Sequence, residues 1–177
     1  YSSVAHAGYL LTALWPGTPL GVSALAFYLV GYGVTSIAAF ALLGALGRDG
    51  ERDVTLDDIG GLAETRPWMA FALSVCMLSL LGFPGTIGFI GKWYILAAIV
   101  ASQHPPLAVI LVLTSVVSAG YYLPVIMAMY MRPARAPLVY HDRGLLGSAR
   151  VAVAVGVVAA LVLGIWPEPI LTLANHA

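Results

Sequence analysis

Residues 68–101, WMAFALSVCMLSLLGFPGTIGFIGKWYILAAIVA, decide the fold of this chain. The stretch is almost wholly apolar, but GFPGT (residues 82–86) lies near its middle and Lys92 follows. A straight helix of this length would reach about 50 Å, against about 30 Å of bilayer hydrocarbon. Pro84 lacks an N–H and clashes with the preceding turn, and Gly85 accepts unusual backbone angles. We therefore expect the helix to break at Pro84-Gly85.

The break and the lysine together indicate an internal site. Broken backbone at membrane depth is tolerated only where protein or water surrounds it. A lysine about two turns past the break would cost about 2.5–3.5 kcal/mol if it faced lipid. Both features predict an internal, partly hydrated site.

The composition is that of an integral membrane protein. Of the 177 residues, 60% are hydrophobic and only 9% are charged, and the mean hydropathy is +0.93. The net charge of zero gives no indication of nucleic acid as a partner. The single cysteine, Cys76, excludes an internal disulfide and favours a small buried apolar side chain. Because Tyr1 falls inside a helical pattern, we expect the C-terminal part of a longer polypeptide.

The pattern predicts an all-α fold, a polytopic membrane helix bundle of about five transmembrane helices with one of them broken. Residues 1–177 are expected to form a single membrane domain. Trp15 and Trp166, each followed by a proline, are typical of helix ends at a membrane interface. The expected helices span residues 1–15, 22–46, 68–101, 106–131 and 148–166.

The basic residues predict the orientation. If each helix crosses once, the broken one included, the connections at 47–67 and 132–150 share one side. Lys92 is the only basic residue outside them. By the positive-inside rule that side is cytoplasmic and the C-terminus lies on the opposite, periplasmic side. The seven arginines are Arg48, Arg52, Arg66, Arg132, Arg135, Arg143 and Arg150.

Lys92 is the strongest candidate for chemistry. The sequence contains no phosphate-binding loop, nucleophile elbow or zinc-binding helix motif. Burial favours the neutral amine, whereas a nearby carboxylate favours the ammonium. A lysine balanced between these effects can load and release a proton. The alternative is a lysine near a helix end that extends to the interface, which the apolar residues after Lys92 and the Pro84 break before it disfavour.

Other polar groups in apolar helices are candidates for a hydrated path. His6 shares a helix face with Ser2 and Tyr9, and its side chain titrates near neutrality. The alternative is a histidine that only hydrogen-bonds a neighbouring helix. Further hydroxyl groups recur at helical spacing, and they either order water or join helices through hydrogen bonds. These candidates are Tyr9, Tyr32, Thr35, Ser115, Ser118 and Tyr122.

These stretches resemble the antiporter-like membrane subunits of bacterial respiratory complex I, the proton-pumping NADH-quinone oxidoreductase. The resemblance rests on residues 1–9 (YSSVAHAGY), 58–67 (DIGGLAETRP), 80–92 (LLGFPGTIGFIGK) and 115–123 (SVVSAGYYL). It covers nearly the whole chain, and GFIGK is its most specific part. One departure is Pro124, which stands where the family commonly has a basic residue.

The resemblance implies a fold and a role. The family has fourteen helices, partly in two inverted five-helix repeats with one broken helix each, so this chain resembles the last five. It implies that Lys92 and His6 belong to a hydrated proton path along the membrane midplane. It also implies that NADH, FMN, iron–sulfur clusters and quinone bind in other subunits, and that the partners are neighbouring membrane subunits and lipid in a bacterial inner membrane. Two alternatives remain: a subunit of a multisubunit cation/proton antiporter, and a structural scaffold.

Overall fold

The computed structural model describes residues 2–46, 54–133 and 147–168, and every regular element in these ranges is a helix. The predicted all-α fold is therefore confirmed for this part of the chain. Arg48, Arg52, Arg135 and Arg143 lie outside the described residues. The helices are α1 (Ser2–Leu14), α2 (Pro19–Leu46), α3 (Leu62–Thr65), α4 (Pro67–Leu81), α5 (Ile87–Ala101), α6 (Pro105–Met131) and α7 (Gly147–Ile165).

The expected helices are present, with small corrections at their ends. The second helix begins at Pro19 rather than at residue 22, because proline is well suited to a first helical position. The short helix α3 was not expected; it lies in the connection that precedes the broken helix. α2, α6 and α7 have 28, 27 and 19 residues and are long and apolar enough to span a membrane.

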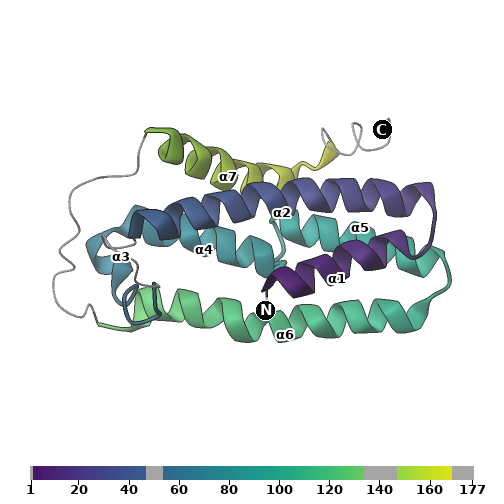
Figure 1. Cartoon of the computed structure of the whole chain (residues 1–177), viewed down its shortest axis with the longest axis horizontal. Coiled ribbons are helices and arrows are strands. Elements are labelled where there is room, and N and C mark those ends of the chain that lie inside the picture. The colour runs from purple at the N-terminus through teal and green to yellow at the C-terminus, as the bar shows by residue number, and fades with distance from the viewer. Residues whose placement is uncertain (1, 47–53, 134–146, 169–177) are drawn as a thin grey trace.

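The broken helix crosses the bundle once. α4 and α5 have 15 residues each, so each is about 22 Å long and neither is as long as the bilayer core. They follow one another end to end between α2 and α6, which both run along the whole bundle (Figure 1). α1 begins near the middle of the bundle in this view and packs against α2, α5 and α6. A re-entrant hairpin is thereby excluded for these two half-helices.

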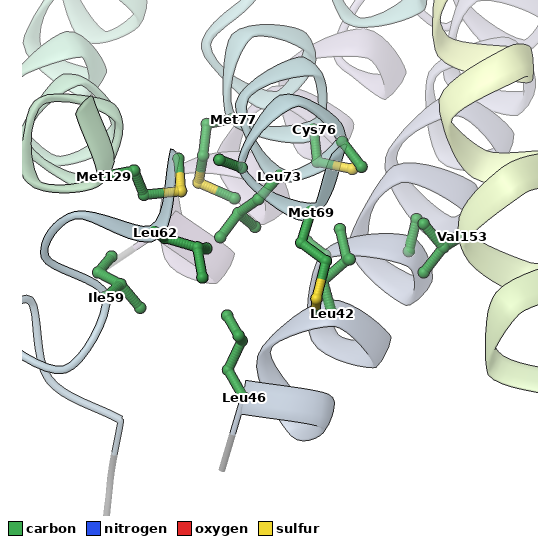
Figure 2. Close-up of a cluster of buried hydrophobic side chains, with 14 of the residues drawn as sticks. Leu42, Leu46, Ile59, Leu62, Met69, Leu73, Cys76, Met77, Met129 and Val153 are labelled. Atoms are coloured by element: carbon green, nitrogen blue, oxygen red, sulfur yellow. The ribbon is translucent and has the colours of Figure 1, made fainter. Parts of the chain in front are cut away.

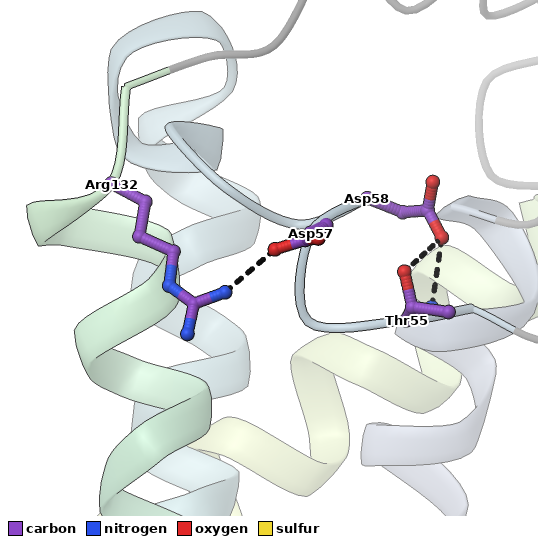
Figure 3. A network of polar contacts seen from close by, with 4 residues as sticks. All are labelled: Thr55, Asp57, Asp58 and Arg132. Carbon is purple, nitrogen blue, oxygen red and sulfur yellow. Dashed lines mark hydrogen bonds and ion pairs between the residues drawn. The ribbon is translucent and has the colours of Figure 1, made fainter.

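One end of the bundle gathers the described arginines. The C-terminal ends of α2 and α6 and the N-terminal end of α7 lie together there with α3 (Figure 1). Asp57 accepts a hydrogen bond from Arg132 at 2.7 Å, while Asp58 accepts bonds from the backbone and hydroxyl of Thr55 (Figure 3). Gly61 also donates its N–H to the Ala128 carbonyl at 3.3 Å. These contacts tie the connection before α4 to the end of α6.

The expected break is confirmed, and Gly82, the first residue of the GFPGT stretch, contributes to it together with Pro84. α4 ends at Leu81, and the capping residue Gly82 adopts a φ of 88°. Gly82 donates its N–H to the Ser79 carbonyl at 3.0 Å, and Phe83 donates to Leu78 at 2.9 Å. These two hydrogen bonds form the Schellman motif, in which the residue after the helix adopts a left-handed backbone that glycine accepts most readily. Pro84 follows two residues later and prevents the helix from resuming immediately.

Apolar side chains fill the interior around α4. Leu42, Leu73 and Met129 are fully buried there, and they come from three different helices. α3 and its preceding turn contribute Ile59 and Leu62 to the same cluster (Figure 2). α4 is thereby packed on several sides before the chain reaches the break. Figure 2 labels Leu42, Leu46, Ile59, Leu62, Met69, Leu73, Cys76, Met77, Met129 and Val153.

Candidate functional site

Lys92 is buried at the break, with only 6% of its surface exposed. Its ammonium group donates to the carbonyls of Leu81 at 2.7 Å and Leu80 at 3.2 Å. A third hydrogen bond, 3.1 Å long, reaches the hydroxyl oxygen of Ser115 on α6. An ammonium has three donors, so these acceptors satisfy it completely. The alternative of a lysine extending to the interface is therefore wrong.

The end of α4 supplies acceptors for this cation because a helix leaves its last carbonyls without intrahelical partners. The Schellman motif uses the Leu78 and Ser79 carbonyls, and those of Leu80 and Leu81 stay free for Lys92. The helix dipole adds partial negative charge at this end. Lys92 lies in the second turn of α5, and helical side chains lean toward the N-terminus of their own helix. The break therefore aims Lys92 at the end of α4.

Glycines make room for this arrangement. A Cβ atom at Gly82 would lie 3.0 Å from Cδ and 3.2 Å from Nζ of Lys92. A Cβ atom at Gly164 of α7 would lie 2.5 Å from the Gly85 carbonyl oxygen, so α7 packs directly on the break. A Cβ atom at Gly91 would lie 2.6 Å from the ring of Tyr28, which brings α5 against α2. The position of Lys92 thus depends on the close packing of α5 against α2 and of α7 against the break.

His6 forms the centre of a second polar group. It is 2% exposed, and both ring nitrogens are hydrogen-bonded: Nδ1 to the Tyr28 hydroxyl at 2.6 Å and Nε2 to the Tyr122 hydroxyl at 2.8 Å. The Tyr122 hydroxyl also bonds the Ser2 hydroxyl. Because a phenol can donate or accept, either neutral tautomer of the imidazole is satisfied. Tyr32 stacks on the His6 ring with a centroid distance of 4.4 Å.

Tyr9 lies between the two groups. The Lys92 Nζ atom is 4.9 Å from the centroid of its ring, a cation–π geometry. The same ring meets His6 edge-on, with centroids 5.8 Å apart and planes at 90°. Tyr9 therefore contacts both Lys92 and His6.

Two of the candidate residues face other partners. The Thr35 hydroxyl donates to the Gly31 carbonyl of its own helix at 2.7 Å and lies 3.4 Å from the Ser79 hydroxyl. The Ser118 hydroxyl donates to the Ser115 carbonyl at 2.5 Å. Thr35 is not among the partners of Lys92 or His6, whereas Ser118 lies one turn from Ser115 and Tyr122 on α6.

The sequence analysis missed part of the site. It did not select Tyr28, although the Tyr28 hydroxyl is hydrogen-bonded to one nitrogen of His6. It also passed over Tyr121, whose buried hydroxyl has no hydrogen-bond partner among the described residues. The carbonyl acceptors of Lys92 carry no side-chain signal; Gly82 before Phe-Pro was the available indication of a free helix end. In the described ranges, no cluster of three or more His, Cys, Asp or Glu residues is suited to a metal ion.

A family model and curated relatives match this chain. The model described as NADH:quinone oxidoreductase/Mrp antiporter, TM, matches residues 1–118. NADH-quinone oxidoreductase subunit N of Gemmatimonas aurantiaca is 45% identical over 181 residues, covering 100% of this chain and 34% of the relative. The same subunit of Trichlorobacter lovleyi is 40% identical over 177 residues, covering 100% and 36%. The chain therefore spans about a third of the length of these relatives.

Solved structures share the fold. A chain of respiratory complex I from Thermus thermophilus, with bound aureothin, matches with a TM-score of 0.81 and 37% identity, over 97% of this chain and 38% of that one. A chain of the Mrp complex from Dietzia sp. matches with a TM-score of 0.80 over 98% of this chain and 40% of that one. Its identity of 22% makes this second likeness one of fold alone.

Proposed function

The chain belongs to the NADH:quinone oxidoreductase/Mrp antiporter transmembrane family, and from this premise we propose that it is part of a proton-translocating membrane subunit of NADH-quinone oxidoreductase. Its role is to couple electron transfer from NADH to quinone, in other subunits, to proton pumping across the membrane. The observation that carries the proposal is the buried Lys92 ammonium, which is hydrogen-bonded to the carbonyls at the C-terminal end of α4 and to Ser115.

Lys92 is the proton-loading group in this proposal. When charged, it uses its three donors on two carbonyls and the Ser115 hydroxyl. After it releases a proton, the amine keeps two donors and gains a lone pair. The Ser115 hydroxyl lies 3.4 Å from the Leu81 carbonyl and can rotate either to donate there or to donate to the amine. Ser115 thus accommodates both protonation states without movement of the backbone.

His6 is the second proton-carrying group. Its two nitrogens face phenol hydroxyls that can exchange donor and acceptor roles, so a proton entering at one nitrogen permits release at the other. The Ser2–Tyr122–His6–Tyr28 chain of hydrogen bonds extends this capability over α1, α2 and α6. Quinone reduction elsewhere would alternately favour and disfavour the charge on Lys92.

The partners and orientation follow the same proposal. Neighbouring membrane subunits of complex I and lipid surround the chain, while NADH, FMN, iron–sulfur clusters and quinone belong to other subunits. The chain lies in a bacterial inner membrane, with the end that bears Arg66, Arg132 and Arg150 in the cytoplasm and the C-terminus in the periplasm. Relatives named subunit N at 45% and 40% identity support complex I over a cation/proton antiporter.

The test replaces Lys92 in the full-length protein within its assembled complex, reconstituted in sealed proteoliposomes. Lys92→Met keeps most of the side-chain length and removes the amine. We expect NADH:quinone turnover and lumen acidification to fall together, because the two are coupled. Trp93→Leu on the same helix is the matched control, since Trp93 is 58% exposed and stacks on Phe89 rather than on Lys92 or His6. Normal turnover and acidification in an assembled Lys92→Met complex would refute the proposal and favour a scaffold.

A further inference from the structure

Gly88, in the first turn of α5, lies directly against the last turn of α4. A Cβ atom at Gly88 would lie 1.8 Å from the carbonyl oxygen of Ser79 and 2.8 Å from its carbonyl carbon. No side chain fits into that space, because a normal contact between a carbon atom and a carbonyl oxygen is about 3.3–3.6 Å. Gly88 therefore brings the two half-helices into contact backbone to backbone.

The same end of α4 binds Lys92. Ser79, Leu80 and Leu81 follow one another in the chain, and the last two carbonyls accept hydrogen bonds from the ammonium at 3.2 and 2.7 Å. Gly88 and Lys92 are four residues apart on α5, so they occupy one face of the helix, one turn apart. The closeness of Gly88 to Ser79 therefore sets the distance between Lys92 and its carbonyl acceptors.

α2 supports this junction from a third helix. The Ser79 hydroxyl lies 3.4 Å from that of Thr35, and both residues are 1% exposed. Thr35 donates to the Gly31 carbonyl at 2.7 Å, and a Cβ atom at Gly31 would lie 3.1 Å from Cγ1 of Ile87. One turn of α2 thus contacts α4 and α5 where they meet. Because α2 and the apolar interior hold α4, a side chain in place of Gly88 displaces the first turn of α5 instead.

We propose that Gly88 is a positioning residue for Lys92. Its missing side chain lets the first turn of α5 lie against the Ser79 carbonyl, and this contact brings the ammonium within reach of the carbonyls at the end of α4. An alanine would have to move from 1.8 Å to about 3.3 Å from the Ser79 oxygen, a shift of about 1.5 Å. Carried along α5, such a shift takes Lys92 out of hydrogen-bonding range of its carbonyl acceptors. The inference rests on the proposed function, in which Lys92 is the proton-loading group.

The test is Gly88→Ala in the full-length protein within its assembled complex, reconstituted in sealed proteoliposomes. We expect proton translocation per assembled complex to fall at least about tenfold, because a misplacement of about 1 Å is enough for such a loss. A high-resolution map of the variant complex is the readout that general destabilisation would not change. It should show the Lys92 Nζ atom more than about 3.5 Å from the Leu81 carbonyl oxygen, against 2.7 Å in this structure.

Gly21→Ala is the matched control, because a Cβ atom at Gly21 of α2 would lie 2.4 Å from the Ala13 carbonyl oxygen of α1. The clash is of the same kind, between the first turn of one helix and the last turn of the helix before it. It lies at the end of the bundle where α1 leads into α2 (Figure 1). Thermal stability should fall in both variants, whereas Gly21→Ala should pump close to wild type and keep the bond from Lys92 to Leu81.

The inference and the proposed function fail in different ways. Wild-type pumping in Gly88→Ala, with Lys92→Met inactive, overturns the inference and leaves the proposed function standing. An equal loss of pumping in Gly21→Ala also overturns the inference, because it assigns the loss to general destabilisation. Normal pumping in Lys92→Met overturns the proposed function itself.

Maps of the complex decide the remaining cases. A map of Gly88→Ala in which Lys92 keeps both carbonyl acceptors overturns the inference even if pumping falls. If Gly88→Ala does not assemble, the wild-type map is decisive. A Gly88 Cα atom about 3.3–3.6 Å from the Ser79 carbonyl oxygen supports the inference, and a clearly larger separation overturns it.

Discussion

The half-helices α4 and α5 have the same length, yet they bury different chemistry. α4 buries Leu73, Cys76 and Met77 in an apolar cluster that includes residues from five helices and the turn before α3. α5 buries Lys92, and its Gly91 packs against the ring of Tyr28, which hydrogen-bonds His6. The break therefore separates two tasks: one half is anchored by packing, and the other carries a cation. The C-terminal end of the anchored half presents the Leu80 and Leu81 carbonyls to that cation.

The largest expected effect on stability comes from the apolar half. Leu73 is fully buried in α4, and Leu73→Ala should destabilise the protein by about 2–5 kcal/mol by leaving a cavity. Thermal unfolding of the detergent-purified complex measures this loss. Pumping per assembled complex should stay close to wild type, because Leu73 lies among apolar side chains and is not a hydrogen-bond partner of Lys92 or His6. A loss of pumping as deep as that of Lys92→Met would show that the two halves are not separate in function.

The difference between the halves was only partly visible in the sequence. The apolar pattern gives the helices, and Pro84-Gly85 gives the position of the break, because these signals depend on local backbone preferences. Lys92 stood out since a lone charge in an apolar helix requires an internal partner. Its actual partners are backbone carbonyls, which look the same at every residue. The pairing of His6 with Tyr28 and Tyr122 joins residues 22 and 116 positions apart, and helical spacing within one segment contains no such information.

A smaller effect distinguishes two glycines within the break. Gly82 and Gly85 have φ angles of 88° and 87°, so alanine at either should cost about 1–2 kcal/mol in backbone strain. A Cβ atom at Gly82 would meet Lys92, whereas nothing lies within 4 Å of one at Gly85. Gly82→Ala should therefore lose more pumping than Gly85→Ala at equal loss of stability. The measurement is proton translocation by both variants, normalised to assembled complex.

Gly85→Ala serves as the matched control for this pair, because it carries the backbone strain alone. Equal pumping by the two variants would mean that the position of the Lys92 side chain near Gly82 does not matter. Such a result would weaken the view that the end of α4 holds the lysine in place. A larger loss in Gly82→Ala would support it, and would assign the effect to the amine rather than to the strain.

The smallest effect is expected at the end of the bundle, where Arg132 and Asp57 join α6 to the turn that leads into the apolar half. Their side chains are 49% and 52% exposed, so water and salt screen the pair. A double-mutant cycle with Arg132→Gln and Asp57→Asn should give a coupling of about 0–1 kcal/mol that falls as salt rises. The same turn and α3 bury Ile59 and Leu62 in the cluster that contains Leu73, and we attribute the anchoring of α4 to that packing. A coupling well above 1 kcal/mol, insensitive to salt, would instead assign the anchoring of α4 to its polar end, and the contrast between a packed half and a charged half would no longer hold.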